Sequence, residues 1–299
     1  MIHHILDPER EVVEAGLTRL LPVDAWPERL HRAMAHAVFA GGKRVRPILA
    51  RLANRAAGSD PDAITEAACA LELIHTYSLI HDDLPAFDDD ILRRGKPTVH
   101  VAFDEATAIL AGDALLTEGL LVLARYPLGT TWAPRRADAV ELVAEAVSVR
   151  GMVGGQMEDL EATGQVAENR EEDPKLRLDR IHRAKTGCLL AASVELGAVL
   201  AGVSEDERRT FADFGAGLGL AFQIADDILD ATASAQDLGK SPGKDAEAGK
   251  LTYVTLYGLD NARSRLADLE KRLVGQAAEI EGSDGDLGAI AQYVARRRN

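Results

Sequence analysis

The sequence GLAFQIADDILD, residues 219–230, places polar side chains at helical intervals in an otherwise apolar segment. Asp226 and Asp230 are four residues apart, and Gln223 precedes Asp226 by three, so a helix brings all three to one face. Such a stripe predicts an amphipathic helix that presents two carboxylates together.

The same periodicity continues along the chain. Apolar residues at spacings of three and four predict helices over 64–83, 104–125, 137–153, 176–201, 206–231 and 251–277. Ala and Leu dominate, and aromatic residues are only 4%, a composition that favours helix over sheet. The breaks are short and none resembles a flexible linker, so we predict an all-α protein in a single domain, residues 1–299. Residues 238–250 are rich in Gly, Lys and Asp and are predicted to form a loop.

The composition also limits the partners. Lys and Arg number 34 against 48 Asp and Glu, and the resulting net charge of −14 argues against nucleic acid. Residues 1–16 lack the apolar core of a signal peptide, and no uncharged stretch is long enough for a membrane span. Cys69 and Cys188 have neither disulfide nor metal-site spacing, so we expect core thiols in a reducing compartment. These features predict a cytoplasmic protein.

A second acidic cluster occupies residues 81–95, which read HDDLPAFDDDILRRG. On an ideal helix His75 and Asp82 share a face, whereas Asp88 would be turned about 240° away from Asp82. Pro85 removes a backbone hydrogen bond and clashes with the preceding turn, so we expect a bulge that returns Asp88 to Asp82.

Carboxylate oxygens suit Mg²⁺, which keeps several waters and binds one or two carboxylates together with substrate phosphates. The two acidic clusters are therefore predicted to hold a metal-bound diphosphate between them. The alternative is that both acidic runs are solvated helix ends. This alternative is the weaker one, because there are two such runs and both have apolar flanks. Neither cluster has the spacing of an EF-hand loop, and the pair His81-Asp82 is only a weak sign of a metal phosphohydrolase.

Cations gather beside these acids. Residues 41–47 read GGKRVRP and put three cations within four residues after a glycine pair, which suits phosphate oxygens, although a surface loop could also have this composition. The further cations are Arg93, Arg94, Lys185, Lys240, Lys244 and Lys250. Together they predict a second anion that is bound directly by Lys and Arg.

These motifs together resemble the trans-isoprenyl diphosphate synthases. The matching segments extend over nearly the whole chain and are GGKRVRP at 41–47, DDLPAFD at 82–88, RRG at 93–95, GGQMEDL at 154–160, AKTG at 184–187, GLAFQIADDILD at 219–230, LGKSPGKDAEAGK at 238–250 and the ending QYVARRRN. The resemblance implies an isoprenoid synthase fold, with helices around a deep central cavity, and a homodimer. It also implies Mg²⁺-dependent head-to-tail condensation of isopentenyl diphosphate with dimethylallyl and geranyl diphosphate to make farnesyl diphosphate.

The resemblance also assigns roles to single residues. Three Mg²⁺ ions on the allylic diphosphate would be held by Asp82, Asp88 and Asp226, with Asp83 and Asp230 in support. The same diphosphate would be contacted by Arg93, Lys185 and Lys240. Isopentenyl diphosphate would be held by Lys43, Arg46, His75 and Arg94. The catalytic set would be Lys185, Thr186 and Gln223, of which the last two would face the reacting carbons. Two residues of the GGQMEDL motif receive no role, Gln156 and Asp159.

Product length would be set by Tyr77 and Ser78, the residues five and four positions before the first aspartate of DDLPAFD. An aromatic residue at Tyr77 together with a two-residue insertion within 84–87 resembles the farnesyl-producing pattern of the family. The alternative is that Tyr77 is simply a core aromatic residue. A geranylgeranyl or geranyl diphosphate synthase is the nearest alternative function. A terpene cyclase would not need the second anion site, and a non-catalytic partner subunit would be expected to lose the aspartates.

Overall fold

The structure, a computed structural model, describes residues 2–164, 173–232, 251–283 and 285–297. The helices are α1 (His3–Leu20), α2 (Glu28–Val38), α3 (Val45–Ala56), α4 (Thr65–Asp82), α5 (Val99–Ala102), α6 (Glu105–Arg125), α7 (Ala133–Val147), α8 (Met152–Ala162), α9 (Pro174–Ile181), α10 (Cys188–Ala201), α11 (Glu205–Thr232), α13 (Tyr253–Tyr257), α14 (Leu259–Glu281) and α15 (Asp286–Arg296). A two-residue hairpin, β1 (Leu92–Arg93) with β2 (Lys96–Pro97), pairs in antiparallel register. The predicted all-α class is confirmed.

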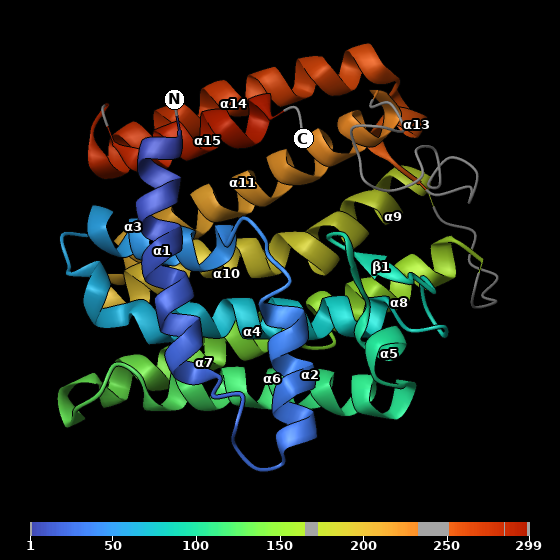
Figure 1. Cartoon of the computed structure of the whole chain (residues 1–299). Helices are drawn as coiled ribbons and strands as arrows, with labels where there is room; N and C mark the ends of the chain where they lie inside the picture. The colour runs from blue at the N-terminus through green and yellow to red at the C-terminus, as the bar shows by residue number, and fades with distance from the viewer. Residues whose placement is uncertain (1, 165–172, 233–250, 284, 298–299) are drawn as a thin grey trace.

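The helices pack in layers (Figure 1). Helices α14 and α15 cover α11, which packs on α10, while α4 lies centrally between α3 and α6. Small residues allow the helix backbones to approach closely, since a Cβ on Gly197 of α10 would collide with the carbonyl oxygen of Ala50 in α3. The apolar core is continuous and runs through all of these layers.

Three predicted helices agree with α4, α6 and α11 to within one or two residues at each end. The helix predicted over 137–153 is wrong at its end, because α7 stops at Val147 and α8 starts at Met152. The helix predicted over 251–277 is interrupted at Gly258, whose φ of +81° is a left-handed value that ends α13. The region 176–201 is helical throughout but contains a π-helical turn, His182–Gly187. The loop predicted at 238–250 lies outside the described residues.

Two helical stretches in the described part of the chain are long and apolar enough to cross a membrane, Glu105–Arg125 and Pro174–Ala201. Both pack within the bundle, α6 against α4 and α10 against α11 and α3. Core helices meet the same criterion of length and composition, so the predicted absence of a membrane span stays a prediction.

The acid-bearing ends of α4 and α11 lie on the same side of the bundle (Figure 1). Both helices run toward the right of the view, where β1, α8, α9 and α13 also lie. The fold therefore gathers the two acidic clusters, the β1–β2 hairpin and the π-helical turn on one side.

Candidate active site

Asp82 and Asp88 come together because α4 ends. The helix stops at Asp82, residues 83–87 form turns, and the backbone N–H of Asp88 then donates to the carbonyl oxygen of Asp82 at 2.9 Å. The predicted return of Asp88 is confirmed, but it is made by a turn after the helix and not by a bulge within a continuing helix. Pro85 explains this difference, since its ring stops the helix from continuing.

The Asp82 carboxyl group lies in a mixed electrostatic environment. Burial raises its pKa from 3.8 to about 6, while Lys185 opposes the rise and Asp88 adds to it. A partly buried carboxyl group with a raised pKa is one that a bound cation would stabilise in its charged form.

Arg93 is tied to the same turn. Its Nε donates to Oδ1 of Asp83 at 2.7 Å, and its Nη2 lies 3.4 Å from Oδ2 of Asp90. Asp83 is buried, so this contact fixes the start of the hairpin against the end of α4. The pair places the Arg93 guanidinium close to Asp82, whose charge contributes to raising the pKa of Arg93.

Lys185 lies in the π-helical turn His182–Gly187. Such turns are rare and occur frequently at functional sites, because they redirect side chains out of the regular helical pattern. The Nζ of Lys185 donates to Oδ2 of Asp159 in α8 at 2.6 Å. Asp159 lies in the GGQMEDL motif, where no role was predicted for it, and in the structure it is the partner of Lys185.

The π-helical turn also packs tightly on α11. A Cβ added to Gly219 would lie 3.0 Å from Cα of Gly187, so the two backbones are in contact there. Thr186 adjoins Gly187 in the chain, and Gln223 lies one helical turn beyond Gly219. The close contact therefore brings together the stretches that carry Thr186 and Gln223.

On α11, Asp226 and Asp227 have different partners. Oδ1 of Asp226 forms an ion pair with Nη2 of Arg297 at 2.5 Å. Oδ2 of Asp227 accepts from the backbone N–H of Tyr253 at 2.6 Å and lies 3.8 Å from Nε2 of His182. Asp227 thus links α11 to the start of α13, while Asp226 pairs with Arg297, a partner that the sequence pattern did not predict.

An arginine cluster surrounds His75. The pKa of His75 is well below its ordinary value because of burial first and then because of the charges of Arg46 and Arg94. Burial also lowers the pKa of Arg46 to about 10, while Glu72 and Asp226 oppose that shift. The Nε of Arg46 is buried and has no hydrogen-bond partner among the described residues, which leaves a donor available to an anion.

Arg44 is a structural member of the 41–47 motif. Its side chain is fully buried and donates to Oε1 of Glu14 and Oε1 of Glu72, each at 2.7 Å, and to the carbonyl of Val38 at 2.6 Å. These bonds hold Arg44 at a φ of +51°, in the left-handed region, and fix the loop that leads to Arg46. Glu72 was missed by the sequence analysis, although it lies three residues before His75.

The remaining predicted residues are placed as follows. Lys43 is exposed beside Arg44, and Arg94 donates to the carbonyl oxygen of Gly41. Ser78 Oγ bonds back to the carbonyl oxygen of His75 at 2.8 Å. Tyr77 is buried and packs edge-on against His81 at 5.7 Å between ring centres. Lys240 lies outside the described residues.

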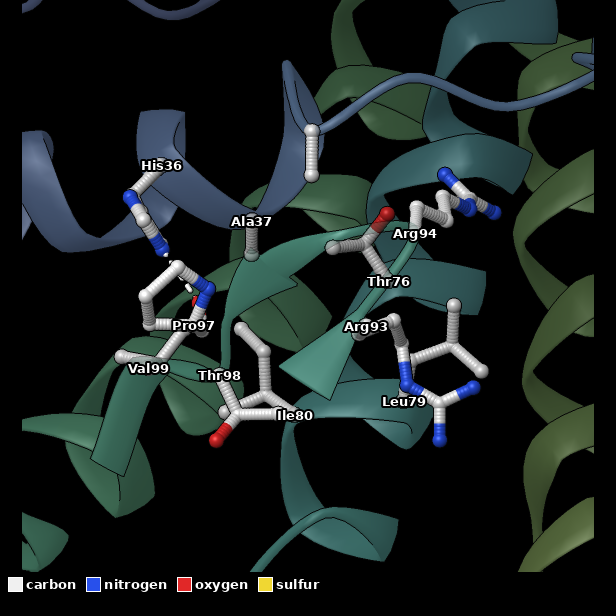
Figure 2. Close-up of a pocket in the computed structure, with 11 residues that line it drawn as sticks. His36, Ala37, Thr76, Leu79, Ile80, Arg93, Arg94, Pro97, Thr98 and Val99 are labelled. Carbon is white, nitrogen blue, oxygen red and sulfur yellow. Dashed lines mark hydrogen bonds between the residues drawn. The ribbon is translucent and has the colours of Figure 1, made fainter. Parts of the chain in front are cut away.

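A pocket beside the β1–β2 hairpin is lined in part by Arg93 and Arg94 (Figure 2). His36 and Ala37 of α2, Leu79 and Ile80 of α4 and residues 97–99 contribute to its lining. The guanidinium groups of Arg93 and Arg94 lie on the side of the view away from His36. The pocket therefore adjoins the charged site and shares Arg93 and Arg94 with it.

The acidic residues of α4 and α11 fit a metal ion that takes few protein ligands better than one that is enclosed by protein ligands. In the part of the chain that the structure describes, no three acidic, histidine or cysteine side chains form a ready-made metal site. Mg²⁺ retains waters and takes one or two carboxylates with substrate phosphates, so separate acids on α4 and α11 fit it. Asp82 and Asp88 would serve from one side and Asp226 from the other.

The sequence comparison decides the family. The polyprenyl synthetase family model matches residues 27–284. The chain belongs to this family. It is 43% identical over 299 residues to farnesyl diphosphate synthase of Geobacillus stearothermophilus, which covers 99% of this chain and 98% of that protein. It is also 42% identical over 294 residues to geranylgeranyl pyrophosphate synthase 11 of Arabidopsis thaliana, covering 97% and 80%.

Solved polyprenyl synthetases have the same fold. An apo FPP/GFPP synthase from Zymomonas mobilis superposes with a TM-score of 0.84 at 35% identity, covering 99% of this chain and 100% of that one. A geranyltransferase from Legionella pneumophila gives 0.82 at 33% identity, covering 100% and 98%. This polyprenyl synthetase is accordingly a prenyltransferase with an isoprenoid synthase fold.

We predict that Asp82→Asn stabilises the protein in the presence of a metal chelator at pH 7. The folded-state pKa of Asp82 is raised from 3.8 to about 6, so its contribution to stability is present at low pH and lost as the pH rises through about 6. The loss amounts to about 2–3 kcal/mol at pH 7. Urea unfolding at pH 4 and pH 7 measures it against Asp89→Asn, an exposed acid of the same cluster. Equal pH dependence of the two variants would contradict the prediction.

Proposed function

We propose that the protein condenses isopentenyl diphosphate with an allylic diphosphate, dimethylallyl and then geranyl, to make farnesyl diphosphate. The observation that carries this proposal is that the acids of α4 and α11 lie close to the arginine cluster around His75, since the charge of Asp226 acts on Arg46 and that of Asp82 acts on Arg93. A metal-bound diphosphate fits the acidic surface, and a diphosphate held directly by cations fits the arginine cluster.

Ionisation of the allylic substrate would take place at the acidic surface. The carboxylates of Asp82, Asp88 and Asp226 would hold Mg²⁺, proposed as three ions. Bound Mg²⁺ would stabilise the negative charge that grows on the departing diphosphate. Lys185 and Arg93 would add fixed positive charge there, and the acids paired with them, Asp159 and Asp83, would keep these cations in position.

The second substrate would bind at the arginine cluster. Arg46 offers a buried Nε donor. Burial, and then the cations around it, lower the pKa of His75, so its neutral ring can donate a hydrogen bond without adding charge. Lys43 and Arg94 would complete the set, and we extend the allylic set to Lys240. A terpene cyclase has no use for this second cluster, so the cluster favours chain extension.

Carbon–carbon bond formation would follow between the two sites. The double bond of isopentenyl diphosphate would attack the allylic cation, which Thr186 and Gln223 would help to stabilise. The released diphosphate would accept the departing proton, since the carboxylates are committed to metal. Apolar surroundings would protect the cation from water.

A farnesyl product is the main proposal, and geranylgeranyl diphosphate is the alternative. Named relatives of both kinds match this chain at similar identity, 43% and 42%. Tyr77 supports the shorter product, because its buried ring is close enough to Asp82 for that charge to add to the burial that raises the pKa of Tyr77 to about 12.

Product analysis tests the function. Purified protein is incubated with Mg²⁺, dimethylallyl diphosphate and labelled isopentenyl diphosphate, and the products are dephosphorylated and chromatographed. Farnesol is the expected alcohol, and geranylgeraniol would replace the proposed product by its alternative. Folded protein that yields no labelled alcohol would contradict chain extension and favour a cyclase or a non-catalytic subunit.

We predict that Tyr77→Ala makes products longer than fifteen carbons. Each further five-carbon unit gains about 4 kcal/mol when fully buried, so growth continues once the obstructing ring is removed. Chromatography of the alcohols measures the shift against the wild-type protein. An unchanged distribution from folded Tyr77→Ala would refute the assignment of this ring as the floor.

We also propose a cytoplasmic homodimer. Helix α6 exposes Ile109, Leu110 and Leu121, an apolar face that a second chain would cover, and Leu110 is 58% exposed. The cytoplasmic location is supported by the two free cysteines, Cys69 and Cys188. Cell fractionation tests it, and recovery of the protein outside the soluble fraction would contradict it.

The dimer proposal predicts the effect of a charge on this face. Leu110→Glu should convert the dimer to a monomer, because a buried unpaired carboxylate opposes association. Light scattering after size exclusion measures the mass, with the substitution Glu118→Gln on the same helix as control. A monomeric wild-type protein would contradict the dimer, and a dimeric Leu110→Glu variant would contradict this interface.

A further inference from the structure

Arg297 follows α15 and is buried against the second acidic cluster. Its side chain is only 7% exposed, and its Nη2 lies 2.5 Å from Oδ1 of Asp226. The same Nη2 donates to the carbonyl oxygen of Phe222 at 2.8 Å, and the guanidinium carbon lies 3.7 Å above the Phe222 ring. Three independent contacts therefore fix this arginine on α11.

The neighbouring arginine behaves differently. Arg296 lies on the surface, where its side chain is 67% exposed, and pairs with Glu270 of α14 at 2.6 Å. A basic chain end that was merely attracted to an acidic protein would leave both arginines at the surface. The burial of Arg297 indicates a specific contact with α11.

The contact conflicts with a metal ion at the same carboxylate. A guanidinium and a divalent cation repel each other, and Arg297 already occupies one of the lone-pair sites of this carboxylate. Asp226 is 44% exposed on its side chain, so a metal ion can reach the carboxylate from the solvent side.

We propose that Arg297 is a built-in cation that sets the metal affinity of Asp226 by neutralising this carboxylate until a metal-bound diphosphate replaces it. The inference rests on the proposed role of Asp226 as a metal ligand. A metal ion alone competes with Arg297 for the Asp226 carboxylate. A metal ion that arrives with diphosphate is also held by the phosphate oxygens, so it can displace the arginine. The arginine therefore favours entry of metal together with diphosphate over entry of metal alone.

The coupling is reciprocal. If Arg297 weakens metal binding, then metal binding must weaken the contact of Arg297 by the same factor. Removing the guanidinium should raise the affinity for metal alone about tenfold, within the usual range of such couplings. Metal with diphosphate should release the chain end from α11.

Manganese titration tests the proposal. Free Mn²⁺ is measured by electron paramagnetic resonance for the wild type, for Arg297→Gln and for the matched control Arg296→Gln. Tighter Mn²⁺ binding in Arg297→Gln alone is the expected result. Unchanged or weaker binding in Arg297→Gln, or an equal gain in both variants, would overturn the proposal.

Two further measurements distinguish the failures. Asp226→Asn should lose Mn²⁺ affinity. An unchanged affinity would mean that the metal binds elsewhere, and it would overturn this inference. The proposed function would then still be tested separately, by product formation. Hydrogen exchange of the peptide 287–297 should rise when Mn²⁺ and inorganic pyrophosphate are added. Slower exchange there would mean that the arginine stays bound in the loaded site, contrary to the proposal.

Discussion

The site depends on one buried arginine. Arg44 lies between Glu14 of α1 and Glu72 of α4 and donates to the carbonyl oxygen of Val38 at the end of α2. A single guanidinium therefore connects α1, α2 and α4. A charge buried this completely is destabilising unless its hydrogen bonds are made, and here three partners make them. Because Arg44 also starts α3, the position of Arg46 beside His75 follows from this contact.

Internal counter-ions recur throughout the site. Glu72 opposes the arginines around His75, Asp159 holds Lys185, Asp83 holds Arg93, and Arg297 neutralises Asp226. These pairs allow dense charge of both signs to remain folded before substrates arrive, since an unpaired buried charge is costly. Substrate diphosphates and metal would then substitute for the more exposed partners, while fully buried Arg44 stays in place as scaffold.

Local sequence patterns predicted much of the helical fold and of the two acidic clusters. The face shared by Gln223, Asp226 and Asp230 follows from helical periodicity alone. Pro85 in the sequence predicted that the chain brings Asp88 back beside Asp82. Contacts between Asp159 and Lys185 or between Arg297 and Asp226 join residues far apart in the chain, so tertiary packing determines them. The break at Gly258 and the π-helical turn were also missed, because apolar periodicity alone does not distinguish them from a continuous helix. The predicted roles of site residues rest on family resemblance and stay predictions.

The central claim is that the chain binds two diphosphates by different means, one through metal and one directly through arginine. Calorimetric titration with inorganic pyrophosphate tests it most directly. With a chelator present, the account predicts one bound pyrophosphate per chain, lost in Arg46→Gln but kept in Asp82→Asn. Added Mg²⁺ should create a second site, lost in Asp82→Asn. Binding that requires Mg²⁺ at every site, or that shows no second site on its addition, would contradict the account.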